Sequence, residues 1–338
     1  MTTVLSYWTQ FAACALLVGL AGPVLSRCGD IIADKTGLSG DWIGVILLAT
    51  VTSLPELITG VTAVTVAQVP NIAVGDVLGS CVFNLAILVI LDFLHRGESV
   101  YQRAHQGHIL SAGFGIVLIG FVGLNLLITN QGLTYAIGHV GLYTPIIVAL
   151  YALSVRSVFT YERREMEQFA EKTTDRYPEI TLRTATKRFA AASVVVVVAG
   201  VWLPFVGADL ADAMQWNRSF MGTLFVAGVT SLPEVVVTIA ALRIGALDMA
   251  IANLLGSNLF NILILAIDDM LYVEGPLLAK VAPAHAASAA SAVIMTGIVV
   301  VGLLYRPAAR LFRTVGWVSF GLFIVYLLNT YVLYLHGG

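Results

Sequence analysis

The chain has 338 residues, of which 18 are basic and 20 are acidic, so that only 11% are charged. Soluble domains carry roughly 25% charged residues, and disordered chains combine low hydrophobicity with high charge. Because 58% of the residues are hydrophobic, the composition excludes both classes and predicts an all-α polytopic membrane protein. The net charge of −2 offers no basic surface for nucleic acid, and three scattered cysteines predict no disulfide framework.

Long apolar runs place the expected membrane spans along the chain, since a spanning helix needs about 20 apolar residues. The first run lacks the positively charged start of a signal peptide, so we expect it to be a retained span. In chain order, the runs predict ten spans at 5–25, 42–66, 71–93, 108–128, 133–154, 189–208, 219–241, 247–267, 284–304 and 314–335.

The distribution of basic residues predicts which way these spans point. If both termini lie outside, sixteen of the 18 basic residues fall in inside loops, and only Arg218 and Lys280 lie outside. Lys and Arg concentrate in cytoplasmic loops, so this bias supports ten spans with both termini outside.

Two motifs occur twice in the sequence. The segment 44–56 and the segment 222–234 both end in VTSLPE, and Gly79–Asn84 matches Gly256–Asn261. Each copy lies in a half with five predicted spans, and an odd number makes the halves enter the membrane in opposite directions. We therefore predict two inverted five-helix repeats, 1–155 and 189–338, joined by a cytoplasmic connector, 156–188. Inverted repeats are typical of secondary transporters that bind their substrate near the midplane.

A glutamate ends each copy of the first motif, and both glutamates are expected at mid-span. A charged group at that depth indicates a functional site, although a protonated structural glutamate is the alternative for Glu56 and Glu234. The preceding prolines, Pro55 and Pro233, lack an N–H and clash with the carbonyl four residues earlier. We expect each helix to kink or unwind there, which leaves the carbonyl oxygens of Val51 and Val229 free.

The remaining side chains of the motifs predict a cation site built from oxygen. Oxygen-only sites with six to eight ligands suit Ca²⁺, and Na⁺ accepts the same atoms, whereas zinc or copper would require His or Cys. Two glutamates neutralise one divalent ion, which makes exchange against a monovalent cation natural. The predicted ligands beside the two glutamates are Thr52, Ser53, Ser80, Asn84, Thr230, Ser231, Ser257 and Asn261.

Four further acidic positions lie near the motifs or the span ends. Asp76 is four residues before Ser80, hence on the same helix face, and we hypothesise that it adds a third negative charge near the site. The alternative is a charge at a helix N-terminus, favoured by the helix dipole. Asp92 and the pair Asp268 and Asp269 are interpreted as interfacial anchors or vestibule charges rather than ligands.

The doubled TSLPE and GS-x-x-x-N motifs resemble those of the calcium/cation antiporter superfamily, specifically the prokaryotic type of the sodium/calcium exchanger membrane family. The resemblance covers both halves and implies a central site on the second, third, seventh and eighth helices. It implies that the ten residues matched to the motifs are the ligands, and that the first and sixth helices slide across the core. The sequence departs from the family at Val51 and Val229, where the family usually has Gly, and at Cys81, where it usually has Asn.

Together these features predict a secondary antiporter that exchanges Ca²⁺ for Na⁺, located in a bacterial or archaeal plasma membrane. Buried carboxyl groups also bind protons readily, so a H⁺-coupled antiporter with the same site is the first alternative. A passive cation channel and a membrane scaffold are weaker alternatives. We expect no enzymatic activity, no cofactor and no obligatory protein partner, only the transported ions and the lipid bilayer.

Overall fold

The computed structural model describes residues 2–36, 43–95, 98–166, 177–307, 310–311 and 315–336. These residues are almost entirely helical, and the strands among them are two antiparallel pairs with two residues per strand. The middle of the predicted connector, 167–176, lies outside the described residues.

The first half of the chain contains seven described helices and one short hairpin. The hairpin, β1 (Ala136–Ile137) with β2 (Val140–Gly141), precedes the last helix of this half. The helices are α1 (Thr2–Lys35), α2 (Ile43–Thr52), α3 (Leu54–Thr65), α4 (Pro70–Leu94), α5 (Val100–Arg103), α6 (His108–Asn130) and α7 (Tyr143–Met166).

The second half follows the same order. A π-helix, η1 (Met221–Val226), a 3₁₀-helix, η2 (Leu277–Ala279), and the strands β3 (Arg310–Leu311) and β4 (Val315–Gly316) separate its described α-helices. These are α8 (Leu182–Met214), α9 (Arg218–Phe220), α10 (Ala227–Thr230), α11 (Leu232–Arg243), α12 (Leu247–Leu271), α13 (His285–Tyr305) and α14 (Trp317–His336).

Eight helices in the described part of the chain are long and apolar enough to cross a membrane. The pair Arg218–Thr230 and Leu232–Arg243, which meets at a bend of 44°, adds a ninth if it counts as one span. The span expected at 42–66 is divided into α2 and α3, and each piece alone is short for a span. The start expected at residue 133 is wrong. Residues 131–142 form turns and the hairpin, with positive φ angles at Gly132 and Gly138, so helix α7 begins only at Tyr143.

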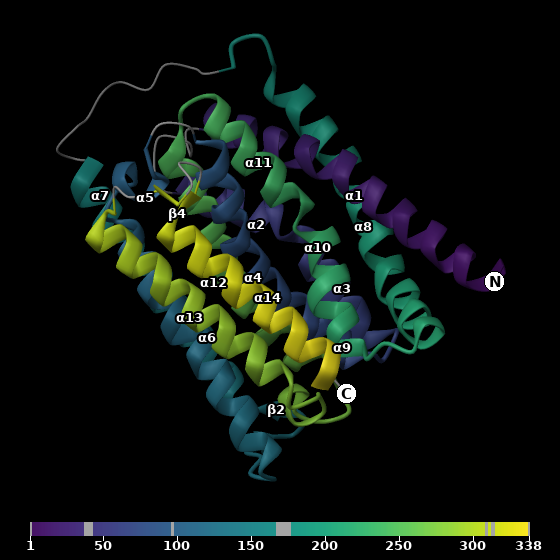
Figure 1. Ribbon diagram of the computed structural model, residues 1–338. Helices are drawn as coiled ribbons and strands as arrows, with labels where there is room; N and C mark the ends of the chain where they lie inside the picture. The colour runs from purple at the N-terminus through teal and green to yellow at the C-terminus, as the bar shows by residue number, and fades with distance from the viewer. Residues whose placement is uncertain are drawn as a thin grey trace.

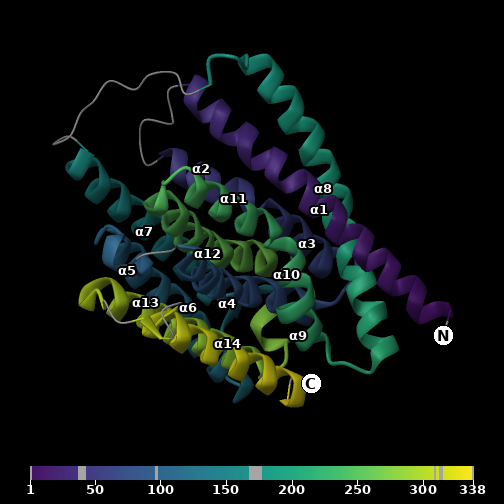
Figure 2. The same ribbon diagram turned by 45° about the horizontal axis from the view of Figure 1, so that its top comes forward.

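The helices form a buried centre between two flanks. Helices α4 and α12 run through the centre, whereas α1 and α8 lie side by side along one flank and α6, α13 and α14 along the other (Figures 1 and 2). The flanking helices expose large apolar side chains, such as Leu20 of α1 and Val301 of α13. An apolar outer surface around a polar centre is what a bilayer requires of a helical protein.

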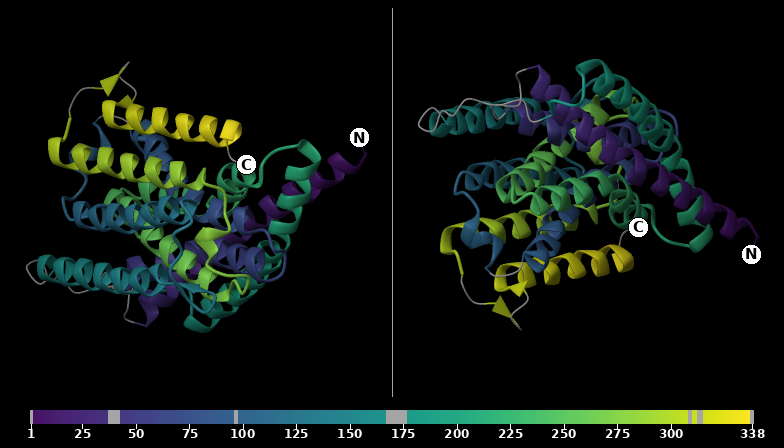
Figure 3. Two further views of the ribbon diagram at one scale, coloured as in Figure 1. Left: turned by 90° about the horizontal axis from the view of Figure 1, so that it is seen from below. Right: turned by 90° about the horizontal axis from the view of Figure 1, so that it is seen from above.

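The helix ends define two ends of the bundle. The start of α1 and the end of α14 lie toward one end, which we call the terminal end, and α7 finishes at the opposite end, which we call the connector end (Figure 3). Asp92, near the end of α4, bonds to Ser319 at the start of α14, so α4 runs from the terminal end to the connector end. Asp269, near the end of α12, bonds to Tyr143 at the start of α7, so α12 runs the other way.

Candidate cation site

The two TSLPE segments break their helices at the same residue. Helix α2 ends at Thr52 and α3 begins at Leu54, with Ser53 between them at φ −86° and ψ 14°. In the second copy, Ser231 separates α10 from α11 at φ −82° and ψ 8°. The interruption expected from the prolines is thus present in both copies.

The position of the break also explains how proline is accommodated. Pro55 and Pro233 lie in the first turn of α3 and α11, where a residue has no helical N–H bond to lose. Glu56 and Glu234 follow them in the same first turns. Each carboxylate consequently sits at the start of a new helix, where the helix dipole favours negative charge, rather than in the middle of a continuous helix.

Each helix break binds the glutamate of the other half. The hydroxyl of Ser53 donates to Oε1 of Glu234 at 3.2 Å, and the hydroxyl of Ser231 donates to Oε1 of Glu56 at 3.1 Å. All four side chains are fully buried. The two TSLPE segments, 178 residues apart in sequence, therefore meet at one place.

The second motif supplies one serine to each glutamate. Ser80 of α4 donates to Oε1 of Glu56, and Ser257 of α12 donates to Oε1 of Glu234, both at 3.3 Å. The hydroxyl of Thr52 lies 3.3 Å from that of Ser257. The four motifs thus build one cluster, and the same contact occurs twice within it.

Amide side chains complete the cluster where α4 and α12 cross. The Asn84 side chain donates from Nδ2 to Oδ1 of Asn258 at 3.0 Å, and Asn258 donates from Nδ2 to the carbonyl of Cys81 at 3.2 Å. Sequence reasoning did not single out Asn258, although it occupies the position equivalent to Cys81 in the second repeat. The amide of Asn258 joins the two central helices. Asn84 Oδ1 and both polar atoms of the Asn261 side chain have no hydrogen-bond partner.

Several buried oxygen atoms of this cluster have no hydrogen-bond partner. A buried polar atom without a partner is costly, and hard cations bind such carboxylate and amide oxygens. In the described residues, no three His, Cys, Asp or Glu side chains gather closely enough to hold one ion, so hydroxyl and amide oxygens would have to share the coordination. The unpartnered atoms are Oε2 of Glu56, Oε2 of Glu234, Oδ2 of Asp76, and Oδ1 of Asn84 and Asn261.

Asp76 is held against the second TSLPE segment. It is fully buried and accepts a hydrogen bond from the hydroxyl of Thr230 at 2.8 Å. No acidic residue occupies the first turn of α4, so the alternative of a charge at a helix N-terminus is wrong. Thr230 is thereby directed to Asp76 rather than to either glutamate, and a role of Asp76 in cation binding stays a prediction.

The valines that replace the family's glycines pack against neighbouring helices. A Cβ atom added to Gly29 of α1 would lie 3.4 Å from Cγ1 of Val51, and Val229 is buried. Coordination by the carbonyl oxygens of these two residues stays a prediction.

Two of the aspartates near the span ends are structural anchors. Asp269 accepts from the backbone N–H groups of Gly141 and Leu277 at 2.9 and 2.7 Å, and from the hydroxyls of Tyr143 and Thr144. At the equivalent position of the first repeat, Asp92 accepts from the N–H groups of Val100 and Gly316 and from the hydroxyl of Ser319. These bonds tie loop segments to α12 and α4, as the anchor interpretation expected.

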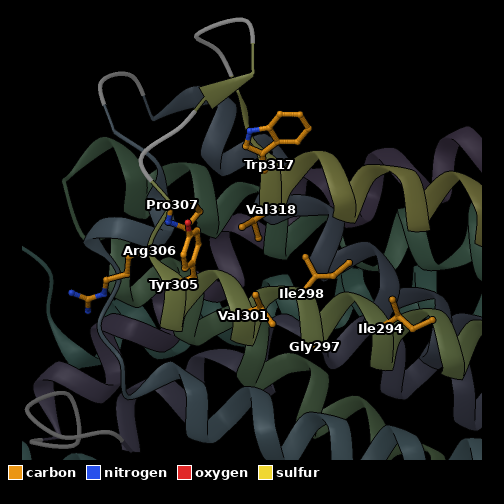
Figure 4. Close-up of a pocket in the computed structure, with 9 residues that line it drawn as sticks. All are labelled: Ile294, Gly297, Ile298, Val301, Tyr305, Arg306, Pro307, Trp317 and Val318. Carbon is orange, nitrogen blue, oxygen red and sulfur yellow. The ribbon is translucent and has the colours of Figure 1, made fainter.

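One pocket in the described residues is separate from this cluster. It has a volume of about 1080 Å³ and lies between α13 and α14, lined by α13 residues between Ile294 and Val301 and by Trp317 and Val318 of α14 (Figure 4). None of the predicted ligands lines this pocket, so it is not part of the candidate cation site.

Comparison with known proteins supports the resemblance seen in the motifs. The inner membrane protein YrbG of Escherichia coli is 26% identical over 326 residues, which cover 95% of this chain and 97% of YrbG. The crystal structure of the H⁺/Ca²⁺ exchanger CAX is similar with a TM-score of 0.69 at 14% identity, over 97% of this chain and 85% of CAX. A structure of the sodium–calcium exchanger NCX_Mj is similar with a TM-score of 0.60 at 19% identity, over 96% of this chain and 98% of that one.

The family itself is identified by its sequence profile. The profile described as "Sodium/calcium exchanger protein" matches residues 6–154 and 185–332, which contain both copies of the motifs. The fold similarity extends over nearly the whole chain. The chain is therefore an integral membrane protein that belongs to the sodium/calcium exchanger family.

Proposed function

We propose that this protein is a secondary active antiporter that exchanges Ca²⁺ for Na⁺ by alternating access at the cluster around Glu56 and Glu234. The observation that carries the proposal is the crossed pair of serine–glutamate hydrogen bonds. Each glutamate uses Oε1 for these bonds and keeps a buried, unpartnered Oε2. Two buried carboxylate oxygens without partners in one cluster suit a divalent cation.

The remaining ligands follow from the same cluster. Hydroxyl groups of the TSLPE segments and of Ser80 and Ser257, the amide oxygens of Asn84 and Asn261, and the carbonyl oxygens of Val51 and Val229 complete the coordination. Asp76 adds negative charge beside Thr230. Coupling arises because the two carboxylates cannot fully coordinate Ca²⁺ and Na⁺ at the same time.

The membrane arrangement that we propose has ten spans in two inverted repeats, 1–155 and 189–338, with 156–188 as a cytoplasmic connector. Helices α2 and α3 together form the second span, and α9 to α11 form the seventh. Both termini lie outside a bacterial or archaeal plasma membrane. The recurrence of the serine–glutamate contacts and of an aspartate anchor in both halves supports this arrangement.

Movement of α1 and α8 would open the site to alternate sides. Gly22 of α1 lies directly against Pro233, since an added Cβ would be 2.5 Å from its Cγ. Gly200 of α8 lies against α3 in the same way, with an added Cβ at 2.9 Å from Ile58. Each flanking helix therefore covers the helix break of the opposite half, which places it well to respond when a cation binds there.

Proton-coupled Ca²⁺ exchange is the second candidate. The fold is similar to that of the H⁺/Ca²⁺ exchanger CAX as well as to that of NCX_Mj, and buried carboxylates are able to take up protons in place of a cation.

Transport by the purified protein in lipid vesicles distinguishes these functions. We expect Ca²⁺ uptake when an outward Na⁺ gradient is imposed, and none with an outward H⁺ gradient alone. Uptake driven only by protons would establish the second candidate, and uptake that needs no counter-gradient would indicate a channel. Unchanged uptake by a Glu56→Gln, Glu234→Gln double variant would refute the site itself.

A further inference from the structure

One buried carboxyl group has no role in the cluster or in the anchors. Asp268, in the last turn of α12, is fully buried, and neither carboxylate oxygen has a hydrogen-bond partner. Its neighbour Asp269 accepts four hydrogen bonds. An ionised group buried without a partner is strongly unfavourable, and a bound cation would supply the partner that Asp268 lacks.

Asp268 packs onto the helix that carries Glu56. A Cβ atom added to Gly60 would lie 2.5 Å from Oδ2 and 3.0 Å from Oδ1 of Asp268. Gly60 is four residues after Glu56, hence on the same face of α3 one turn away. The absence of a side chain at Gly60 therefore leaves room for the carboxylate beside the backbone of α3, one turn from the central site toward the terminal end. Thr59, next to Gly60, has a buried hydroxyl that also lacks a partner.

Asp76 lies on the same side of the centre. Helices α4 and α12 cross at Asn84 and Asn258 in opposite directions. Residues before Asn84 on α4 and residues after Asn258 on α12 therefore both extend toward the terminal end. Asp76 and Asp268 are in these two stretches, and Oδ2 of Asp76 is another buried oxygen without a partner.

The two repeats differ at both of these positions. Asp76 corresponds to Asn253 in the second repeat, and Asp268 corresponds to Leu91 in the first. Because α4 and α12 run in opposite directions, both acidic members lie toward the terminal end and both neutral members toward the connector end. The positions equivalent to Gly60 and Asp268 in the opposite repeats are Thr238 and Leu91, and neither carries a charge. Carboxylates thus lie between the centre and the terminal end, and the equivalent positions between the centre and the connector end carry none.

We propose that Asp268 is a second binding station for a hard cation, on the path between the central site and the terminal end, with Asp76 placed between the two. This inference rests on the proposed function, because a station on a path presupposes transport through the centre. A cation that arrives from the terminal end binds at Asp268 before it reaches Glu56 and Glu234, whereas a cation from the connector end meets no such group.

The proposal predicts an effect that depends on the side of the membrane. In vesicles of defined orientation, Asp268→Asn should raise the Ca²⁺ concentration for half-maximal uptake about tenfold when Ca²⁺ is supplied at the terminal end. The value should change less than twofold when Ca²⁺ is supplied at the connector end. Gly60→Ala, which leaves all charges unchanged but places a Cβ against the carboxylate, should act in the same direction. Asp212→Asn removes an exposed carboxylate near the end of α8 and serves as the matched control for surface charge.

Equilibrium binding provides a second measurement that does not require transport. In detergent, the Glu56→Gln, Glu234→Gln variant should still bind one Ca²⁺ in calorimetric titration, and adding Asp268→Asn should abolish it. Equal effects of Asp268→Asn from both sides, or no Ca²⁺ binding by the double glutamine variant, would overturn the second station. Continued transport by the double glutamine variant would instead refute the central site, so the two failures are distinct.

Discussion

At the scale of single residues, the buried acids of this protein divide by their partners. Asp92 and Asp269 accept several hydrogen bonds from backbone N–H groups and hydroxyls. Glu56 and Glu234 accept serine hydroxyls on one oxygen only. A carboxylate whose oxygens are fully engaged stabilises local structure, whereas one with a free oxygen remains able to bind a cation.

Neutralising either central glutamate is expected to weaken Ca²⁺ binding. Glu56→Gln or Glu234→Gln removes one of the two negative charges while it keeps the side-chain size. We expect affinity to fall at least tenfold, which corresponds to about 1.4 kcal/mol, with a similar loss of exchange. Calorimetric titration and vesicle uptake measure the two effects. Glu274→Gln, at an exposed loop residue, is the matched control, and an equal effect there would contradict the assignment.

Removing an anchor should instead lower stability. Asp269→Asn replaces a charged acceptor of four hydrogen bonds with an amide that cannot accept them all. Hydrogen bonds to charged groups contribute about 1.5–3 kcal/mol each, so we expect a loss of at least that size and a lower melting temperature in detergent. The Ca²⁺ affinity of the folded fraction should stay near that of the wild type. A stable variant with impaired binding would assign Asp269 to the site.

At the scale of elements, the breaks at Ser53 and Ser231 shape the proposed site. Each break starts a new helix whose first turn holds proline and glutamate, and it directs the serine hydroxyl to the opposite half. The flanking helices approach these breaks through glycines, where any side chain would collide. Packing of α1 and α8 is therefore directly linked to the geometry of the ligands.

A side chain at Gly22 should disturb this packing. The Cβ atom of Gly22→Ala would lie 2.5 Å from Cγ of Pro233, and overpacking of this kind typically costs about 1–3 kcal/mol. We expect slower Ca²⁺ exchange, by about tenfold, with folded protein still obtained. Gly297→Ala on α13, where an added Cβ meets nothing within 4 Å, is the control. If both variants transport equally well, the flank does not govern access to the site.

At the scale of the whole molecule, the duplicated halves produce one shared centre. Neither half holds a complete set of contacts, because each glutamate is bound by a serine of the other half. The copies have nevertheless diverged, because Asp76 and Asp268 toward the terminal end correspond to the neutral residues Asn253 and Leu91 toward the connector end. This asymmetry distinguishes the two sides of an otherwise repeated framework.

Cysteine labelling tests the proposed orientation. The natural cysteines at 14, 28 and 81 are buried, so a cysteine introduced at an exposed position is labelled above a low background. With both termini outside, Gln131→Cys in the α6–α7 loop should react with a membrane-impermeant maleimide in intact cells. Glu179→Cys, near the start of α8, should react only after the cells are opened. The reverse pattern would invert the proposed topology.

The sequence by itself predicted the class of protein, which is confirmed, and singled out the two glutamates that the fold brings into one cluster. Scarcity of charge makes a buried glutamate conspicuous, and an exact repeat of VTSLPE marks which glutamates matter. Sequence periodicity could not show where α7 begins, because the turns and hairpin at 131–142 contain enough apolar residues to look like a span. The prolines predicted an interruption of each helix, but not that Glu56 and Glu234 lie in the first turn of a new helix, since the exact position of a break depends on what packs against it.

Only the tertiary structure decided which side chains meet. Contacts such as Ser53 with Glu234, Asn84 with Asn258 and Gly60 with Asp268 join residues more than 170 positions apart, and no local pattern specifies them. For the same reason, two adjacent aspartates, Asp268 and Asp269, looked alike in sequence but differ in the fold. One faces a loop rich in hydrogen-bond donors, and the other faces the bare backbone of Gly60 beside the central site.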